Sequence, residues 1–363
     1  MDSFSPARTT HSWRLNVSCE PLVLTEEPRP VPKGREVLMK VSHCGVCHSD
    51  LHIREGKYNI GGGRSLNLSD RGLKLPLTLG HEILGTVEAV GPEVTTVKPG
   101  DRRLLHTWIG CGECPLCKSG DENLCAAPQF LGVQARGGFA EHVLVRDEEF
   151  LVDVEGLDPA LAATYACSGV TVFSAVNKIR PHREGEKIAV FGIGGLGQTA
   201  LQLLKALGMG PVIAVDPSPE KRRIAEQIGV AATLDPNAPD AAKQLSAFAE
   251  GKLAAALDFV GAEGTTTSLA INGLRKGGQL VIVGLFGGEL RYPLPFIPMR
   301  AISIRGSYVG SLRELKEFVA LVRKVKLAPI PIEKRPMSQV NEALHDLEAG
   351  KVAGRIVLEA EPA

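Results

Sequence analysis

The most constraining feature of the sequence is a glycine-rich turn between an apolar segment and a helical one. Gly192, Gly194 and Gly197 follow the apolar run IAVF, and the stretch LGQTALQLLKALG continues from Leu196. In this context the spacing G-x-G-x-x-G predicts a strand, a tight turn and a helix that packs closely on the strand. We therefore expect a dinucleotide-binding βαβ unit whose helix N-terminus faces the phosphates of the ligand.

The pattern around this turn continues for more than a hundred residues. Apolar strands alternate with helical stretches from about residue 187, in the order KIAVFG, LGQTALQLLKALG, PVIAVD and PEKRRIAEQIG. The later segments AALDFVG, QLVIVG and AISIRGS, together with the short ATL before Asp235, bring the expected strands to about six. This half is predicted to be a doubly wound parallel sheet.

Asp216 ends the second of these strands, nineteen residues after Gly197. A carboxylate at this place accepts hydrogen bonds from ribose hydroxyls and repels a 2′-phosphate, which favours NAD over NADP. Lys221, Arg222 and Arg223 follow closely and could soften that preference. The alternatives are a plain βα turn for the glycines and a helix-capping or solvated acid for Asp216.

The first 150 residues have a different texture. Short β-rich runs such as EVLMKVSHC and TVEAVG alternate with Gly and Pro, and this half holds seven of the nine His and seven of the eight Cys. At the other end, SLRELKEFVALVRKV is an amphipathic helix, and HDLEAGKVAGRIVL indicates a helix, a turn and a strand. We expect a β domain over 1–160, the sheet over 161–308, and a segment 309–363 that returns to the first domain.

Composition narrows the class of protein. Hydrophobic residues make up 44% and charged residues 23%, and Lys plus Arg equals Asp plus Glu at 41 each. A balanced charge and 5% aromatic residues disfavour a nucleic-acid binder, including one built on zinc knuckles. Apolar runs fall short of the roughly 18 residues of a membrane span, and MDSFSPARTTHSW is too polar for a secretory signal. We expect a cytoplasmic protein with a small-molecule partner.

Four cysteines lie in one short loop. Cys111, Cys114, Cys117 and Cys125 form C-x2-C-x2-C-x7-C within a lobe of about 106–128. In a reducing cytosol such spacing predicts metal ligands rather than disulfides, and four thiolates close the tetrahedral shell of a structural Zn²⁺. An iron–sulfur cluster is the alternative, but the C-x2-C-x2-C-x3-C-P run it favours is absent.

A second, reactive metal site is also possible. The remaining cysteines are Cys19, Cys44, Cys47 and Cys167, and His residues occur in CGVCHSDLH and GHE. A catalytic zinc needs three protein ligands and one exchangeable position. Spacing alone does not choose these ligands.

Five motifs occur in one order, GVCHSDLH, GHEILGTVEAVG, GCGECPLC, ACSGVTVFSAV and GIGGLG. With them the sequence resembles the zinc-containing medium-chain alcohol dehydrogenases over nearly its whole length. The resemblance implies a GroES-like β-barrel catalytic domain beside a six-stranded Rossmann domain. It also implies NAD and two zinc ions per chain, one catalytic and one structural.

The resemblance assigns the catalytic zinc to Cys47, His81 and Cys167. Glu82 would be an occasional alternative ligand, and Asp50 would hold His81 from behind. Cys44 and Cys19 are then interpreted as thiols packed in the core.

The implied reaction moves a hydride between the substrate carbon and the nicotinamide, while a proton leaves through Ser49, the nicotinamide ribose and His52. A capping serine and a surface histidine are the alternative for that pair. Packing or surface charge is the alternative for the weaker coenzyme contacts. The residues expected at the coenzyme are His48, Thr171, Gly192, Gly194, Gly195, Leu196, Gly197, Asp216, Lys221, Val260, Val283, Leu285 and Arg355.

Cys167 as third ligand disfavours the polyol and threonine dehydrogenase branches, which leaves primary or secondary alcohols. Tyr58 and Trp108 fall where related enzymes place aromatic pocket walls, although both could be core aromatics. The stretch Gly61 to Gly72 is expected to be an irregular surface loop, and we hypothesise that it is a lid selecting medium-sized, aryl or cyclic alcohols.

Two other enzymes remain as alternatives, an aryl (cinnamyl-type) alcohol dehydrogenase and a zinc-free quinone or enoyl reductase. A homotetramer of dimers that pair near Arg291 to Tyr308 is expected, with a simple dimer as the alternative.

Overall fold

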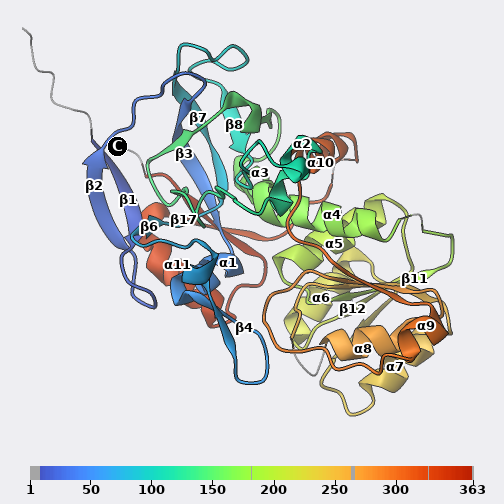
Figure 1. Ribbon diagram of the computed structural model, residues 1–363. Coiled ribbons are helices and arrows are strands. Elements are labelled where there is room, and N and C mark those ends of the chain that lie inside the picture. The colour runs from blue at the N-terminus through green and yellow to red at the C-terminus, as the bar shows by residue number, and fades with distance from the viewer. Residues whose placement is uncertain (1–8, 181, 263–265, 326, 362–363) are drawn as a thin grey trace, which may run out of the picture.

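A computed structural model describes residues 9–180, 182–262, 266–325 and 327–361. Residues 1–8, which belong to the N-terminal stretch that is too polar for a secretory signal, lie outside these ranges. Two bodies are visible in Figure 1, a β-rich one built around β3 (Val37–Val46) and β7 (Glu82–Val90), and an α/β one that contains β11 (Lys187–Phe191). The helices that join them lie in the middle of the molecule.

The β-rich body is a strongly curved set of mostly antiparallel strands. Its larger sheet has the order β10-β8-β7-β3-β18-β17, and β9 also pairs with β3. A smaller sheet has the order β2-β1-β6. The bounds not yet given are β1 (Thr9–Leu15), β2 (Val23–Pro28), β6 (Leu77–Thr78), β8 (Arg102–Leu105), β9 (His142–Val145), β10 (Leu151–Asp153), β17 (Ile332–Pro336) and β18 (Arg355–Glu359).

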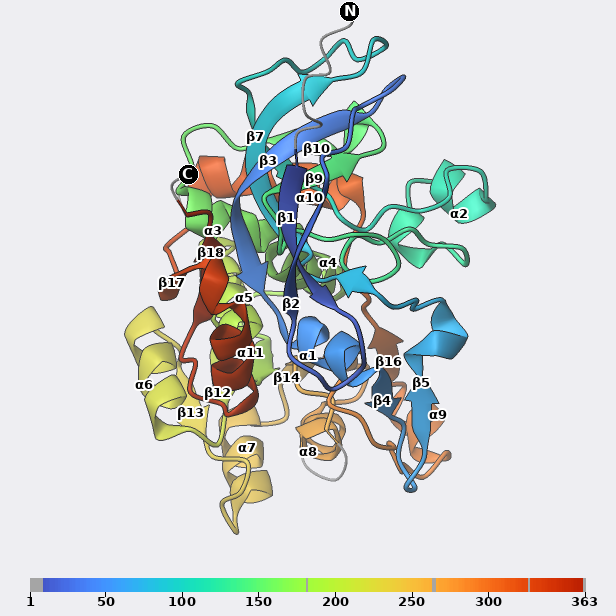
Figure 2. The same ribbon diagram turned by 90° about the vertical axis from the view of Figure 1, so that its left-hand side faces the viewer.

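The end of the chain completes this body. β18 runs antiparallel to β3, with Leu358 opposite Cys44, and parallel to β17, with Ile332 opposite Arg355. The helix α11 (Val340–Glu348) between them buries Val340 and Leu344 in the same core as β3 and β7. The two ends of the described chain therefore lie in one body, and the α/β body is inserted between them (Figure 2).

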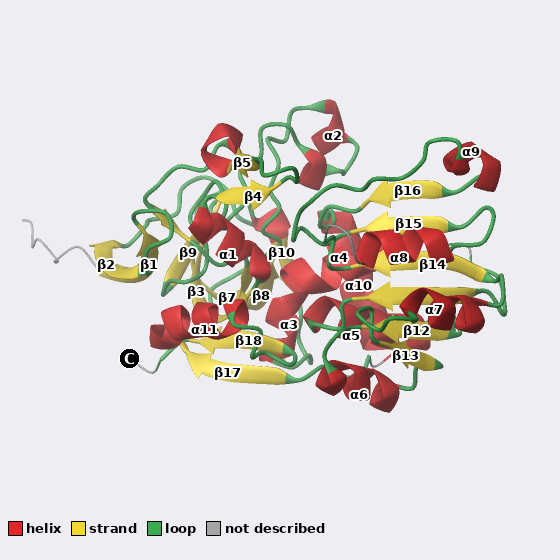
Figure 3. Ribbon diagram, turned by 90° about the horizontal axis from the view of Figure 1, so that it is seen from below, coloured by secondary structure: helices red, strands yellow, loops and turns green. Residues whose placement is uncertain are grey.

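The α/β body confirms the predicted six-stranded parallel sheet. The strand order is β13-β12-β11-β14-β15-β16, visible from β16 to β13 in Figure 3. The further strands are β12 (Val212–Val215), β13 (Ala232–Leu234), β14 (Leu253–Asp258), β15 (Gln279–Ile282) and β16 (Ser303–Gly306). Helices cover both faces of the sheet and bury an apolar core on each. One face packs against α5 (Gly195–Ala206) and α6 (Pro219–Ile228), and the other against α7 (Ala241–Ala249) and α8 (Thr266–Gly273). Short α9 (Phe296–Arg300) precedes β16.

One helical stretch is longer and more apolar than the sequence led us to expect. Pro159–Lys178 spans α3 (Pro159–Thr164), the π-helical turn η4 (Tyr165–Gly169) and α4 (Val170–Lys178). By length and composition alone this stretch could span a membrane, so the prediction that apolar runs fall short of a span is wrong. However, most of this stretch is buried, because it forms the core that joins the two bodies. It is therefore a core helix, and α10 (Leu312–Val325) packs against it.

The expected irregular loop at 61–72 is only partly irregular, because residues 65–71 form a short strand and a helical turn. β4 (Lys57–Asn59) and β5 (Ser65–Asn67) pair as an antiparallel hairpin, and the single turn η1 (Leu68–Arg71) follows. Arg64 Nη2 at the hairpin tip lies 2.6 Å from Glu289 Oε1, and Gly288 N–H donates to Asn59 O at 3.3 Å. The hairpin thus reaches from the β-rich body to the α/β body.

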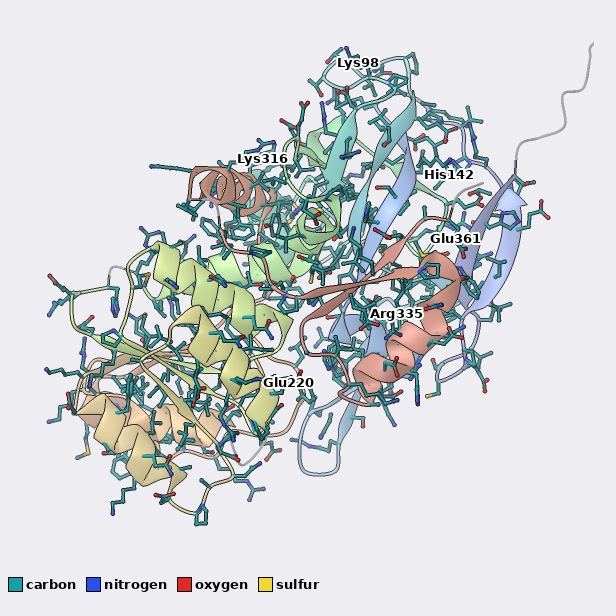
Figure 4. All side chains as sticks on the ribbon, turned by 180° about the vertical axis from the view of Figure 1, so that it is seen from behind. Lys98, His142, Glu220, Lys316, Arg335 and Glu361 are labelled. Atoms are coloured by element: carbon teal, nitrogen blue, oxygen red, sulfur yellow. The ribbon has the colours of Figure 1, made fainter. Side chains whose placement is uncertain are left out.

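The four-cysteine lobe contains α2 (Pro115–Lys118) and the turn η2 (Glu122–Leu124), and it projects from the side of the molecule in Figure 2. Figure 4 shows charged side chains such as Lys98, Lys316 and Glu220 on the outside of the molecule, and all three are exposed.

Candidate active site

Three buried donor groups converge between the two bodies. The sulfurs of Cys47 and Cys167 and a ring nitrogen of His81 lie within 4.8 Å of one another. His81 is fully buried, and neither of its ring nitrogens makes a hydrogen bond of good geometry with the described residues. Two thiols and an imidazole that converge in this way fit the three protein ligands of a catalytic zinc.

Cys47 is aimed by the start of α1 (His48–Glu55). It is the N-cap residue, its sulfur faces the N–H of Asp50, and Asp50 Oδ2 accepts the Cys47 N–H at 2.9 Å. This reciprocal arrangement is a capping box in which a thiol takes the place of the usual hydroxyl. Hydrogen bonding to Cys167 holds the pKa of the Cys47 thiol well below its usual value, against the opposing effect of burial. Such a thiol is prepared for the thiolate form that metals bind.

Asp50 also reaches the second donor. Its Oδ1 lies 3.1 Å from His81 Nδ1 and accepts the Gly80 N–H at 3.2 Å. A carboxylate behind Nδ1 leaves Nε2 as the donor atom toward a metal. Asp50 thus lies behind His81 and in contact with the backbone of Cys47, and its role in orienting a metal-bound His81 stays a prediction.

Cys167 lies in the π-helical turn η4. A π-turn adds a residue to one turn of a helix and is frequent at functional sites, because it shifts side chains relative to the helix before it. Trp108 fixes this turn, since its Nε1 donates to Ala166 O at 2.9 Å. Thr171 follows one turn later on α4, and its buried hydroxyl lacks a hydrogen-bond partner among the described residues.

Glu82 and Arg355 form a buried ion pair beside the cluster. The carboxylate of Glu82 pairs with the Arg355 guanidinium and accepts the Ser168 N–H at 3.3 Å. Burial raises the pKa of Glu82 to about 7, although the nearby arginine acts in the opposite direction. In this structure Glu82 is thus held away from the three donors. Its role as an alternative ligand stays a prediction.

The four-cysteine lobe brings its sulfurs together as well. All four lie within 4.8 Å of one another, and three pairs are separated by 3.5, 3.9 and 3.9 Å. Tetrahedral Zn–S bonds of about 2.3 Å require sulfurs roughly 3.8 Å apart, so the lobe fits a zinc ion with no open position.

The glycine turn lies against the C-terminal segment. A Cβ at Gly197 would collide with Gly192 O, so the close approach of α5 to β11 requires glycine there. A Cβ at Gly195 would collide with the stem of Arg355. Gln198, which the sequence did not mark, is fully buried and donates to Ile193 O at 3.0 Å and to Ala353 O at 2.6 Å.

Asp216 is buried at the end of β12. Its carboxylate accepts the Ile193 N–H at 2.7 Å and the Ser218 N–H at 2.9 Å. Arg222 Nη1 is bound to Asp216 O at 2.7 Å and lies 3.4 Å from Asp235, so it is turned away from the carboxylate of Asp216. This arrangement favours a ribose diol over a 2′-phosphate.

The other expected coenzyme residues come from both bodies and from the helical stretch between them. Val260 packs on Gly192, His48 places its ring 5.4 Å from that of Phe286, and the guanidinium of Arg355 is engaged by Glu82. Leu285 is exposed, and the rest are buried or half-buried. These are Thr171, Leu196, Lys221 and Val283. Contact of each with a coenzyme stays a prediction.

Ser49 and His52 lie one turn apart on α1 and are half-buried. The His52 ring is 4.9 Å from that of Tyr58 on β4, which places Tyr58 next to the expected proton path. Partial burial lowers the pKa of His52 below its usual value.

An aromatic wall lines the cluster. Trp108, Phe130 and Val309 are buried against Cys47 and Cys167, and Tyr308 lies 6.2 Å from the Trp108 ring. Only Trp108 carried a signal in the sequence. Phe130 and Val309 come from loops without a motif.

The prediction that Cys44 and Cys19 are both core thiols is wrong for Cys19. Cys44 is fully buried, in line with a core thiol, but Cys19 is exposed in a turn where its φ is 68°. The turn preceding β2 exposes this side chain, so Cys19 is not a core residue.

Comparisons with known proteins agree with this geometry. Residues 33–156 match the family model of the alcohol dehydrogenase GroES-like domain, and residues 195–324 match that of the zinc-binding dehydrogenases. An NAD-dependent alcohol dehydrogenase of Sulfurisphaera tokodaii is 36% identical over 96% of this chain and 99% of its own length. The chain belongs to the zinc-type medium-chain alcohol dehydrogenase family.

Solved structures of similar proteins superpose over nearly the whole chain. The alcohol dehydrogenase of Aeropyrum pernix is 32% identical, with a TM-score of 0.86 over 96% of this chain and 99% of its own. The acetophenone reductase of Geotrichum candidum, solved with NAD, is 30% identical, with a TM-score of 0.83 over 97% of each chain. The match to this family includes both bodies and the helical core between them.

Proposed function

We propose that the chain is an NAD-dependent alcohol dehydrogenase whose catalytic zinc is held by Cys47, His81 and Cys167. The observation that carries this proposal is the convergence of these three buried donors, with His81 lacking a hydrogen-bond partner of good geometry among the described residues. Cys111, Cys114, Cys117 and Cys125 would hold the structural zinc. When bound, the catalytic ion would supply Lewis acidity toward the alcohol oxygen, and NAD would accept the hydride.

The residues of the chain orient the reactants. The coenzyme would lie along the edge formed by the glycine turn, with Asp216 at its adenosine ribose and Thr171 and Val283 at the nicotinamide end. Because Thr171 and Cys167 share one continuous helical stretch, the nicotinamide pocket and the donor cluster are fixed relative to each other. A rigid link of this kind favours the alignment that hydride transfer needs.

Ser49 and His52 would carry the proton away from the alcohol. Their side chains project from adjacent turns of α1, directly after Cys47. The lowered pKa keeps the His52 imidazole neutral, and so able to accept a proton, at neutral pH.

The substrate we propose is a medium-sized, aryl or cyclic alcohol, or the matching carbonyl compound. Trp108, Phe130 and Tyr308 offer flat apolar faces next to the cluster, which suit a ring better than a short chain. The acetophenone reductase among the related structures acts on a ketone of this kind. The β4–β5 hairpin, with Tyr58 on its first strand, would close over such a substrate.

We also propose that two copies of the chain pair through β16, as the first step toward a homotetramer. The described residues include no strand on the outer edge of β16, and exposed apolar side chains lie on it at Ile304 and in the segment before it at Leu294, Phe296 and Met299. An unpaired edge with an apolar surround is the usual setting for strand pairing between subunits. A reducing, cytoplasmic location is proposed because all eight cysteines are free thiols.

The deciding experiment measures metal content and activity on the same preparation. We expect two zinc ions per chain by elemental analysis, and NADH formation, followed by absorbance, with a panel of primary, secondary, aryl and cyclic alcohols. NADP should give much slower turnover. A protein without zinc that reduces quinones or enoyl compounds would replace this proposal with the zinc-free reductase alternative.

A further inference from the structure

We propose that Asn123, in the four-cysteine lobe, is a positioning residue that holds the segment Tyr308–Val309 against the Cys47 and Cys167 cluster and so sets alcohol selectivity. This inference rests on the proposed function and assigns a role to the lobe beyond holding a metal. It rests on three observations, which concern the backbone of Val309, the hydrogen bonds of the segment, and the rings it touches.

Val309 adopts a backbone conformation that is unfavourable for its type. Its φ is 43°, in the left-handed region, and valine is branched at Cβ. β-branched residues rarely occupy this region, and when they do the surrounding structure holds them there, often at functional sites. Val309 is also buried against the donor cluster. Something outside the segment must therefore stabilise this conformation.

Hydrogen bonds on either side fix the ends of the segment but not its middle. Ser307 N–H donates to Ile282 O at 2.9 Å at the end of β15, and Ser311 begins α10 by exchanging hydrogen bonds with Glu314. Among the described residues, Tyr308, Val309 and Gly310 take part in no backbone-to-backbone hydrogen bond. The carbonyl of Tyr308 instead accepts from Asn123 Nδ2 at 2.9 Å.

The lobe holds the next residues in a second place. The carboxylate of Glu122 accepts the Leu312 N–H and lies 3.3 Å from Nε2 of the fully buried His106. His106 directly follows β8 of the β-rich body, where its N–H donates to Phe150 O at 2.8 Å. Asn123 is 7% exposed and belongs to a lobe turn that is anchored to the β-rich body. This turn binds the stretch 308–312 at two points, Tyr308 and Leu312.

The segment forms part of the wall around the donor cluster. The ring of Tyr308 lies 6.2 Å from Trp108 and 6.3 Å from Phe130, and Val309 is packed with Cys47 and Cys167. Without the hydrogen bond from Asn123, Val309 would relax toward an ordinary conformation and move this wall. A small alcohol depends on the wall for its orientation, whereas a bulky one is also held by Trp108 and Phe130.

The test compares Asn123→Asp with the control Leu124→Ala, which changes an exposed residue of the same turn. Asp has the same shape as Asn but cannot donate to the Tyr308 carbonyl. For Asn123→Asp with two zinc ions retained, we expect kcat/KM for ethanol to fall about tenfold and that for cyclohexanol less than threefold. Asn123→Ser should act in the same direction, and serves if the aspartate variant does not fold. Leu124→Ala should leave both values unchanged.

A rescue separates positioning from a general loss of stability. Glycine occupies the left-handed region freely, so the double variant Asn123→Asp with Val309→Gly should regain selectivity to within threefold of Val309→Gly alone. Hydrogen–deuterium exchange of peptides covering 307–312 should be faster in Asn123→Asp than in the wild type and the control. An unchanged alcohol ratio and unchanged exchange in Asn123→Asp would overturn the proposal, as would equal losses for both alcohols. The exchange measurement keeps its meaning even if the wild type oxidises no alcohol, so the two proposals can fail separately.

Discussion

Ser49 is the residue with the most direct part in the proposed proton path. It lies on α1 two residues after Cys47. Ser49→Ala removes the hydroxyl but leaves all metal donors in place. We therefore expect kcat to fall by about 10² or more, with both zinc ions retained by elemental analysis. Near-normal turnover would remove Ser49 from the mechanism.

The lowered pKa of His52 predicts how alcohol oxidation depends on pH. Partial burial lowers its pKa, so the neutral form that accepts the proton persists below the usual value of about 6.5. The group loses function as pH falls through this lowered pKa, which places the acid limb of the kcat profile below about pH 6.5. In His52→Gln that limb should disappear from the profile, with lower kcat throughout. A limb that is unchanged in the variant would assign the titration to another group.

At the residue level, sites built from residues close together in the sequence could be predicted from local patterns. Sites that combine residues far apart in the sequence could not. The four lobe cysteines lie within one loop, so their spacing alone indicated a closed metal site. Cys47, His81 and Cys167 are far apart in sequence, and only the resemblance to a family joined them. Phe130 and Val309 reach the cluster from loops, where position depends on tertiary contacts. The exposure of Cys19 likewise follows from a turn that the sequence does not specify.

At the element level, the β4–β5 hairpin is the feature most suited to select substrates. Its tip contacts the α/β body through Arg64 and Glu289, while its first strand carries Tyr58. Shortening residues 60–64 to a two-residue turn should lower the preference for cyclohexanol over ethanol several-fold, because apolar contact area is lost. Arg64→Ala should have a smaller effect in the same direction. The matched control is Arg71→Ala, an exposed residue in the turn after the hairpin.

The kinetic measurement is kcat/KM for both alcohols at saturating NAD. If the shortened variant keeps the ranking of the wild type, the hairpin is not a lid for the substrate.

Elements with regular periodicity were predictable and irregular ones were not. The strands β11 to β16 and helices α5 and α6 follow from apolar runs that alternate with amphipathic stretches. β17 has the sequence IEKRP, which lacks both alternation and apolar content, and it is a strand because β18 pairs with it. The hairpin at 57–67 is rich in glycine and polar residues, so its order comes from contacts across the two bodies.

For the whole molecule, the outer edge of β16, which pairs with no other strand of the described residues, predicts how copies associate. Leu294 and Met299 are 76% and 68% exposed in the segment before β16, and burial of both would stabilise a paired dimer. Met299→Glu combined with Leu294→Glu should shift the protein toward monomer in light scattering coupled to size-exclusion chromatography. Val31→Glu, which charges an equally exposed apolar residue on the β-rich body, should keep the wild-type mass. The same mass for all three proteins would place the interface elsewhere.

The position of β18 has a consequence for synthesis of the protein. This strand lies between β17 and β3, and its first residue, Arg355, pairs with Glu82 beside the donor cluster. A ribosome must therefore release residue 359 before the first-made strands can obtain their last neighbour. A chain cut short near position 350 would leave the edge of β3 open to other proteins and would lack Arg355. Quality-control proteases should accordingly recognise such a product by its unfinished N-terminal half, although the missing residues are at the other end.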